Sequence, residues 1–192
     1  MRSFTIDPAH QGHYTLEDYY ALPDDVRAEL IDGVLFIMNA PTLCHQDIAG
    51  FVYTELFNFV RKKKGPCHPF ISPIDVQLDC DNRTMVQPDV AILCDRSKNI
   101  DRCIYGAPDF IMEVISQSTR KKDMLIKLHK YQNAGVREYW IVDPDRRAVL
   151  VYNFEKEENC TIYGFDSKIP IDIWNGELEI NFKEVEAFCN FQ

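Results

Sequence analysis

Two short apolar runs of the sequence each contain one carboxylic acid, and these acids are the residues best placed to do chemistry. Asp89 lies near the start of the run 88–93, and Glu113 lies inside the run 110–115. An ionised carboxylate is costly to bury unless it has a charged partner or a metal ion. Glu113 has apolar neighbours on both sides, whereas Asp89 follows a proline and could face solvent at a strand edge. The two acids suggest a buried polar site.

A lysine on the following predicted helix could belong to the same site. At about 100° per residue, Met124, Leu128 and Tyr131 fall within about 60° of one another, and Lys127 lies at the edge of this apolar stripe. From there the side chain could bury its stem and keep its ammonium in water. It could equally direct the ammonium toward the two acids, with Asp123 one turn earlier as a partner. The spacing leaves both arrangements open.

Two carboxylates on neighbouring strands and a nearby ammonium are groups that can hydrolyse a phosphodiester with the help of a magnesium ion. Mg²⁺ prefers oxygen ligands and keeps several waters, so one or two carboxylates suffice together with a substrate phosphate. The ion polarises a phosphoryl oxygen and lowers the pKa of a bound water. A lysine can position that water or stabilise the developing charge. The sequence contains no GxGxxG, P-loop, GxSxG or HExxH motif.

The order of the expected helices and strands indicates a mixed central sheet flanked by helices, in the α/β or α+β class. Helices are expected at 15–28, 45–63 and 121–134, and a loop is expected at 95–108. A hairpin turn is expected at Asp32-Gly33. The third helix would connect strands 110–115 and 138–142 as parallel neighbours. Further strands are expected at 74–78, 85–93, 148–154, 161–165 and 177–180.

Composition indicates one globular domain that spans residues 1–192. The chain is 46% hydrophobic and 27% charged, and no apolar run approaches the roughly 18–20 residues of a membrane span. The N-terminus has no apolar signal core, which favours a cytoplasmic protein. The seven cysteines form no CxxC pair, so we expect reduced structural thiols rather than a disulfide framework or a zinc site.

The net charge of −9 is the property that a nucleic-acid partner explains least well. Binding to nucleic acid depends largely on neutralising phosphates, and an acidic chain repels them as a whole. Two basic segments, 61–64 and 120–122, could contact phosphates locally. Each could instead be a solvated helix end, where cations are favoured.

The ordered motifs of the chain resemble the Uma-two family, a bacterial group of endonucleases in the PD-(D/E)XK, restriction-endonuclease-like superfamily. The resemblance extends over roughly residues 14 to 185. Each motif is weak alone, but the ordered set is specific. The matching segments are 15–19, 29–33, 45–46, 87–90, 113–119 and 134–144, together with the spaced Asp123, Lys127 and Tyr131.

The resemblance implies a fold and a set of site residues. It implies a restriction-endonuclease-like mixed sheet with additional hairpins. Asp89 matches the aspartate of the PD motif, and Glu113 matches the acid of the second motif. Lys127 takes the place of the superfamily's lysine, and Glu29 matches an acid that supports the metal or the attacking water. The backbone carbonyl of Val114 is expected as an additional metal ligand.

Two positions depart from the superfamily's or family's usual pattern. Ile115 stands where superfamily members often carry the lysine, and Gln117 stands where a proline is usual in the family. Neither departure removes a proposed catalytic group.

These observations favour a Mg²⁺-dependent endonuclease, with Mn²⁺ as an alternative cofactor, that hydrolyses DNA in preference to RNA and acts as a homodimer. One alternative is a catalytically silent binding or assembly protein that retains the nuclease fold, which the net charge would permit. Another is an enzyme that acts on RNA or on a smaller phosphorylated substrate.

Overall fold

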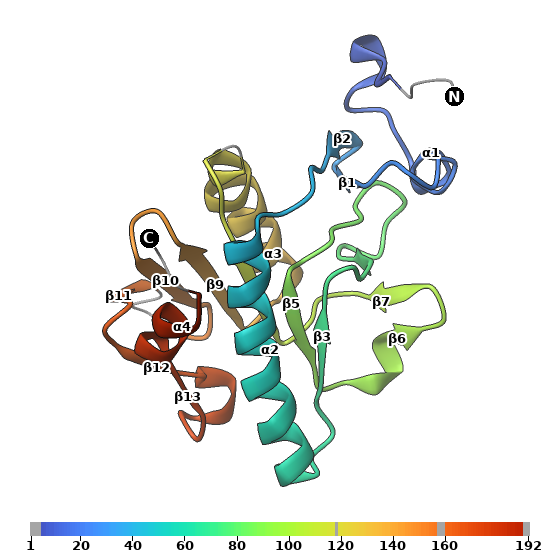
Figure 1. Cartoon of the computed structure of the whole chain (residues 1–192). Helices are drawn as coiled ribbons and strands as arrows, with labels where there is room; N and C mark the ends of the chain where they lie inside the picture. Colours follow the sequence, from blue (N-terminus) through green and yellow to red (C-terminus); the bar gives the residue numbers. More distant parts are fainter. Residues whose placement is uncertain (1–4, 118, 157–159, 190–192) are drawn as a thin grey trace.

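The two apolar runs that carry the acids form adjacent strands at the centre of a six-stranded sheet (Figure 1). The computed structural model describes residues 5–117, 119–156 and 160–189. The sheet has the order β11-β10-β9-β8-β5-β3, in which β8 and β9 are parallel and all other neighbours are antiparallel. The predicted mixed sheet and its parallel pair are therefore confirmed. The strands are β3 (His68–Ile71), β5 (Val90–Leu93), β8 (Phe110–Val114), β9 (Glu138–Asp143), β10 (Ala148–Asn153) and β11 (Cys160–Gly164).

One face of the sheet packs against the long helix α2 (Leu43–Lys63), which crosses in front of the strands in Figure 1. Ile48, Val52 and Leu56 of α2 are 0% exposed, at the helical spacing expected for a buried stripe. The helix begins at the N-cap Thr42, whose side chain accepts a hydrogen bond from the third helical residue. The predicted helix 45–63 is confirmed and is two residues longer at its start.

The opposite face is covered by a π-helix (Lys122–Lys127), the helix α3 (Leu128–Ala134) and a three-stranded sheet of order β4-β7-β6. The predicted helix 121–134 is thus helical, but its first half has π geometry. The expectation of a loop over 95–108 is wrong in part, because β6 and β7 lie within it. The small sheet consists of β4 (Val76–Gln77), β6 (Asn99–Ile100) and β7 (Cys103–Tyr105).

The strands predicted at 74–78 and 85–93 are wrong in extent. β4 has two residues, and β5 begins only at Val90. Met85 and Val86 form isolated bridges instead of a continuous strand. Pro88 explains the interruption because it has no N–H to donate to a ladder. β3 was not predicted, since its Pro69 is unusual in a strand and is tolerated here at the edge of the sheet.

The first α-helix is much shorter than the sequence suggests. Thr15 is its N-cap, as predicted, and Asp18 completes a capping box. However, α1 spans only Leu16–Tyr20, so the expectation of a helix to residue 28 is wrong. Pro23 explains the early end, because a proline inside a helix removes a hydrogen bond and clashes with the preceding turn.

The predicted Asp32-Gly33 hairpin is present as β1 (Ala28–Ile31) and β2 (Val34–Ile37). Asp32 and Gly33 have φ angles of 51° and 80°, as a two-residue hairpin turn with positive φ at both positions requires. The Gly33 carbonyl also accepts hydrogen bonds from the N–H groups of Gly12 and Tyr14. The turn therefore holds the N-terminal segment against the hairpin.

The C-terminal region adds the β12–β13 hairpin, whose second strand overlaps the strand expected at 177–180, and one helix, α4, that the sequence did not predict. α4 buries Phe182 and Val185 in the same hydrophobic layer as α2. Among the described residues, no helix is long and apolar enough to cross a membrane. The remaining elements are β12 (Lys168–Pro170), β13 (Glu179–Asn181), α4 (Phe182–Cys189) and 3-10 turns at Pro8–His10, Arg96–Lys98 and Asp172–Trp174.

A disulfide between Cys67 and Cys94 corrects the expectation of reduced thiols throughout. His68 pairs with Leu93 in the antiparallel strands β3 and β5. Cys67, just before His68, therefore lies opposite Cys94, just after Leu93. Their separation of 27 residues in sequence conceals this proximity, because only the register of the two strands aligns them.

We expect Gly33→Ala to lower the free energy of unfolding by about 1–3 kcal/mol, since a side chain at this φ is strained. A Cβ atom there would also lie 2.7 Å from the Gly12 carbonyl oxygen. Urea denaturation measures the loss. Gly50→Ala is the control: it lies inside α2 with no atom within 4 Å of a new Cβ, and should be neutral or stabilise by up to about 1 kcal/mol. Equal effects of the two substitutions would contradict the role of the turn.

Candidate functional site

The register of β5 and β8 places Asp89 beside Glu113. Val90 pairs with Met112 in these antiparallel strands, so the residues one step further face the same side of the sheet. Asp89 Oδ2 also accepts a hydrogen bond from the Val114 backbone N–H at 2.8 Å. The two acids are 8% and 4% exposed. The fold therefore brings together the two carboxylates that the sequence singles out.

The β1–β2 hairpin adds a third carboxylate, Glu29, to this cluster. Leu30 exchanges backbone hydrogen bonds with Met85, which holds β1 against the segment that leads to Asp89. Glu29 is 0% exposed. Its Oε1 accepts a hydrogen bond from the Gln87 backbone N–H at 2.9 Å.

The ammonium of Lys127 lies between two of these acids. Its Nζ is 2.6 Å from Glu29 Oε1 and 2.7 Å from Glu113 Oε1, and it is 3.6 Å from Asp123 Oδ1. The side chain is only 2% exposed, so the ammonium does not reach into water. Among the ion pairs of the described residues, Lys127 has no contact with Asp89. The lysine thus joins Glu29 to Glu113.

The π-helix explains how a second lysine reaches the same glutamate. Lys122 Nζ forms an ion pair with Glu29 Oε2, and Lys127 Nζ pairs with Oε1. Residues five apart on an α-helix point about 140° away from each other. In the π-helix Lys122–Lys127 the hydrogen bonds run from i to i+5, which brings these two side chains to one face. A period of 3.6 residues could not predict this pairing.

Two buried tyrosines donate hydrogen bonds in the cluster, one to Glu113 and one to the backbone of Asp123. The Tyr131 hydroxyl donates to Glu113 Oε1 at 2.7 Å, and the Tyr139 hydroxyl donates to the Asp123 carbonyl at 3.2 Å. Lys127 donates to the same Glu113 oxygen. Because two donors converge on Oε1, the orientation of the Glu113 carboxylate is fixed.

The sequence interpretation missed His45 as a site residue. Its Nε2 lies 3.1 Å from Asp89 Oδ2. Burial lowers the pKa of His45, but hydrogen bonding to Asp89 and to the Val114 carbonyl outweighs this and raises it above its usual value. The helical period could have found this residue, since His45 precedes Ile48 and Val52 on the buried stripe of α2.

Burial and neighbouring charges separate the pKa values of the two glutamates that bind Lys127. Burial raises the pKa of Glu113 to about 8; Lys127 partly offsets this effect, and the charge of Asp89 adds to it. For Glu29, the charges of Lys127 and Lys122 together outweigh burial and lower the pKa to about 2. Burial therefore disfavours the charged form of Glu113, whereas the two lysines favour the charged form of Glu29.

The cluster suits a divalent cation by charge and by donor type. The buried carboxylates Glu29, Asp89, Glu113 and Asp123 face two lysines, which leaves a formal charge of −2 if all are ionised. Two carboxylates and the Val114 carbonyl are oxygen donors of the kind that Mg²⁺ prefers. Asp123 Oδ1 is buried without a hydrogen-bond partner. No group of three or more His, Cys, Asp or Glu side chains among the described residues is arranged to hold a metal.

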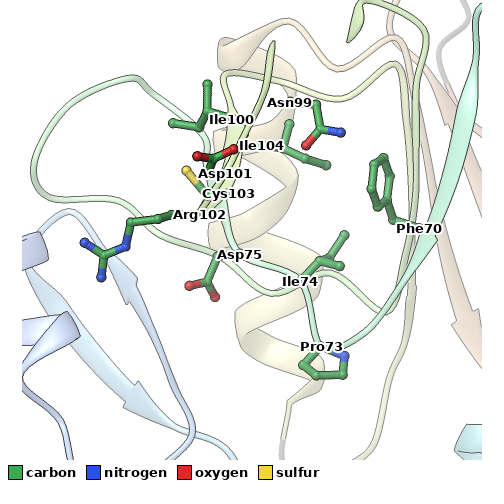
Figure 2. A pocket seen from close by; sticks show the side chains of 10 residues that line it. All are labelled: Phe70, Pro73, Ile74, Asp75, Asn99, Ile100, Asp101, Arg102, Cys103 and Ile104. Atoms are coloured by element: carbon green, nitrogen blue, oxygen red, sulfur yellow. The ribbon is translucent and has the colours of Figure 1, made fainter. Parts of the chain in front are cut away.

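A pocket of about 390 Å³ carries none of the predicted site residues (Figure 2). It lies between the segment 70–75 and the β6–β7 hairpin, and its side chains include Phe70, Asp75 and Arg102. Asp75 Oδ1 accepts a hydrogen bond from Gln87 Nε2 at 2.9 Å. Gln87 also donates its backbone N–H to Glu29, so this residue links the pocket to the acid cluster.

The basic segment 120–122 is not simply a solvated helix end. Arg120 pairs with Asp143, and Lys122 pairs with Glu29. In contrast, residues 61–63 form the last turn of α2 and are exposed or half-exposed. Cations there interact favourably with the end of the helix dipole.

Comparison with a solved structure shows that the mixed sheet flanked by helices is a fold found in a nuclease-like neighbour. A crystal structure described as a "putative nuclease belonging to DUF820" from Anabaena variabilis ATCC 29413 matches with a TM-score of 0.70. The two chains are 22% identical, and the match covers 91% of this chain and 98% of the other.

A comparison with family models identifies the family of the chain. Residues 16–180 match the Uma2 family, described as "Putative restriction endonuclease". The chain therefore belongs to the Uma2 (Uma-two) family, and the resemblance in its motifs is confirmed. The search of curated proteins found no match.

We expect Lys127→Met to destabilise the protein by about 3–5 kcal/mol near neutral pH, because it leaves buried carboxylates without their cation. Without this cation the raised pKa of Glu113 should rise further, and the pKa of Glu29, which Lys127 and Lys122 hold at about 2, should also rise. The folded variant then binds more protons than the folded wild type, so its deficit in stability should shrink as the pH falls from 7 toward 5.

Urea denaturation in the presence of a chelator, at both pH values, measures this effect. Lys63→Met is the control, since Lys63 pairs with Glu177 and is 51% exposed; it should change stability by less than about 1 kcal/mol at either pH. A deficit for Lys127→Met that does not depend on pH would contradict the proposed coupling.

Proposed function

We propose that this protein is a metal-dependent endonuclease that hydrolyses phosphodiester bonds, with DNA as the favoured substrate. The observation that carries the proposal is the position of the Lys127 ammonium, 2.7 Å from Glu113, whose neighbour across the β5–β8 register is the second carboxylate, Asp89. Family membership supports the class of activity. Family membership does not specify a metal, a preference for DNA or the role of each residue. These are part of our proposal.

Asp89 and Glu113 would hold a divalent cation, Mg²⁺ or Mn²⁺, together with the Val114 carbonyl. When bound, the cation would polarise the phosphoryl group and lower the pKa of a water molecule. Asp89 is oriented for this role by the Val114 N–H at 2.8 Å. Glu113 is oriented by the two donors on its Oε1, Lys127 and Tyr131.

Lys127 acts in its charged form. Burial lowers the pKa of Lys127, but the charges of Glu113 and Glu29 more than compensate and raise it well above its usual value. A lysine that stays protonated cannot accept a proton from water. We assign it to donating hydrogen bonds that orient the attacking water and to stabilising the negative charge that develops on the phosphate.

Glu29 positions the lysines. Both of its carboxylate oxygens are engaged, Oε1 by Lys127 and the Gln87 N–H, and Oε2 by Lys122. This arrangement favours anchoring of the two ammonium groups over direct support of a metal or water.

Local positive charge offsets the acidity of the chain at the site. A divalent cation would bring the formal charge of the cluster from −2 to zero, so that a phosphate could approach the two lysines without net repulsion. Homodimerisation, a cytoplasmic location and a single domain over residues 1–192 stay predictions.

A cleavage assay tests the function. Double-stranded DNA, single-stranded DNA and RNA are incubated with the protein in Mg²⁺, Mn²⁺ or a chelator. We expect cleavage of DNA that requires the metal and falls by at least about 100-fold in Asp89→Asn and in Lys127→Ala, in line with the loss of one electrostatic group. Asp89→Asn keeps an acceptor for the Val114 N–H, so it should preserve the fold; thermal unfolding checks this for both variants.

Asp101→Asn is the matched control, since Asp101 is an exposed aspartate on the β6–β7 turn. It should cleave like the wild type. Activity that survives both chelation and Asp89→Asn would refute the proposal. Metal-independent DNA binding without cleavage would favour the alternative, a silent binding protein that retains the nuclease fold.

A further inference from the structure

His45 approaches the acid cluster from the side opposite to Lys127. It lies near the start of α2, whereas the lysines come from the π-helix on the other face of the sheet. Its Nε2 is 3.1 Å from Asp89 Oδ2, and the imidazole also lies beside the Val114 carbonyl. The histidine thus contacts one of the groups proposed to hold the cation, Asp89, directly.

We propose that His45 is a ligand of the divalent cation through Nε2, an inference that rests on the proposed function. Adjacent ligands of an octahedral ion, each about 2.1 Å from it, are about 3.0 Å apart. The observed separation of 3.1 Å between His45 Nε2 and Asp89 Oδ2 matches this spacing. One ion could therefore bind both atoms with little movement of either side chain.

The surroundings of His45 support a ligand more than a structural hydrogen bond. Its Nδ1 is buried without a hydrogen-bond partner among the described residues, so this nitrogen does not fix the orientation of the ring. The backbone that carries it is well anchored, because Ile48 and Ala49 on the next turn are at most 1% exposed. The side chain itself is 18% exposed, which leaves a route for an ion from solvent.

An imidazole ligand would change which metal the site prefers. Oxygen ligands alone suit Mg²⁺, whereas imidazole suits transition metals and their affinity generally exceeds that of Mg²⁺ at nitrogen-containing sites. His45 would therefore give the protein a preference for Mn²⁺ over Mg²⁺, which two carboxylates and a carbonyl would not provide to the same degree.

Pulsed electron paramagnetic resonance of Mn²⁺ added to the full chain tests the proposal without a substrate. Direct coordination should produce a ¹⁴N modulation in the Mn²⁺ signal, which changes to the ¹⁵N pattern when the protein is labelled with ¹⁵N-histidine. This measurement needs no substitution, so it does not depend on whether a variant folds. Isothermal titration with Mn²⁺ and with Mg²⁺ gives the two affinities.

Two variants test whether the nitrogen modulation comes from His45. His45→Gln retains a side-chain N–H that can donate to Asp89 but has no imidazole; it should lose the nitrogen modulation and bind Mn²⁺ at least about tenfold more weakly, the size of effect seen for groups next to a metal. Its Mg²⁺ affinity should fall less. His129→Gln removes an exposed histidine of α3 and should change neither measurement.

The outcomes separate this inference from the proposed function. If Mn²⁺ binds and Asp89→Asn abolishes the binding, but the nitrogen modulation is absent, His45 is not a ligand and the metal-dependent function stands. If the modulation is present and persists in His45→Gln, another histidine is responsible and the inference is wrong. If neither metal binds, both proposals are overturned.

Discussion

The buried ammonium of Lys127 is the interaction on which the arrangement of the site depends. It connects the β1–β2 hairpin, through Glu29, to the central strand β8, through Glu113. Charges this deeply buried are costly, and they persist only when every remaining lone pair or proton finds a partner. Here the Gln87 N–H and Lys122 also contact Glu29, and the Tyr131 hydroxyl donates to Glu113 Oε1. The same contacts therefore hold the hairpin on the sheet and set the geometry of the site.

The layers of the fold contribute to this cluster from different directions. The sheet aligns Asp89 with Glu113, the π-helix supplies both lysines, and α2 supplies His45. The cluster remains two charges short of neutrality when its acids are ionised, and the raised pKa of Glu113 reflects that deficit together with burial. Under the proposed function, a divalent cation would relieve the same deficit and allow a phosphate to approach an acidic chain.

Regular patterns made much of the fold predictable. The apolar stripe of α2, the continuous apolar runs of β8 and β9, and the Asp32-Gly33 turn are local features whose structure follows from residue type and spacing. Elements that contradict local preference were missed. β3 contains a proline, β6 and β7 lie in a polar segment, and α4 begins at Phe182, just after the strand predicted at 177–180.

The site residues also divide into those that local patterns predict and those that they miss. The acids were conspicuous because charge is rare inside apolar runs, and this reason applies to Glu113 more strongly than to Asp89. The spacing around Lys127 left snorkelling and burial equally open, and the resemblance to the family favoured burial without explaining it. His45 was overlooked as a site residue because neither its place on the helix nor the matching segment 45–46 assigned it a role.

The sequence by itself determined the class of fold, the two central acids and the family, because these depend on local periodicity and on residues close together in the chain. Only the tertiary structure decided that Lys127 pairs with Glu29 and Glu113, that Lys122 reaches the same glutamate, and that Cys67 meets Cys94. Each of these contacts depends on strand register or on a π-helical turn. Both are set by how distant segments pack, so no local pattern encodes them.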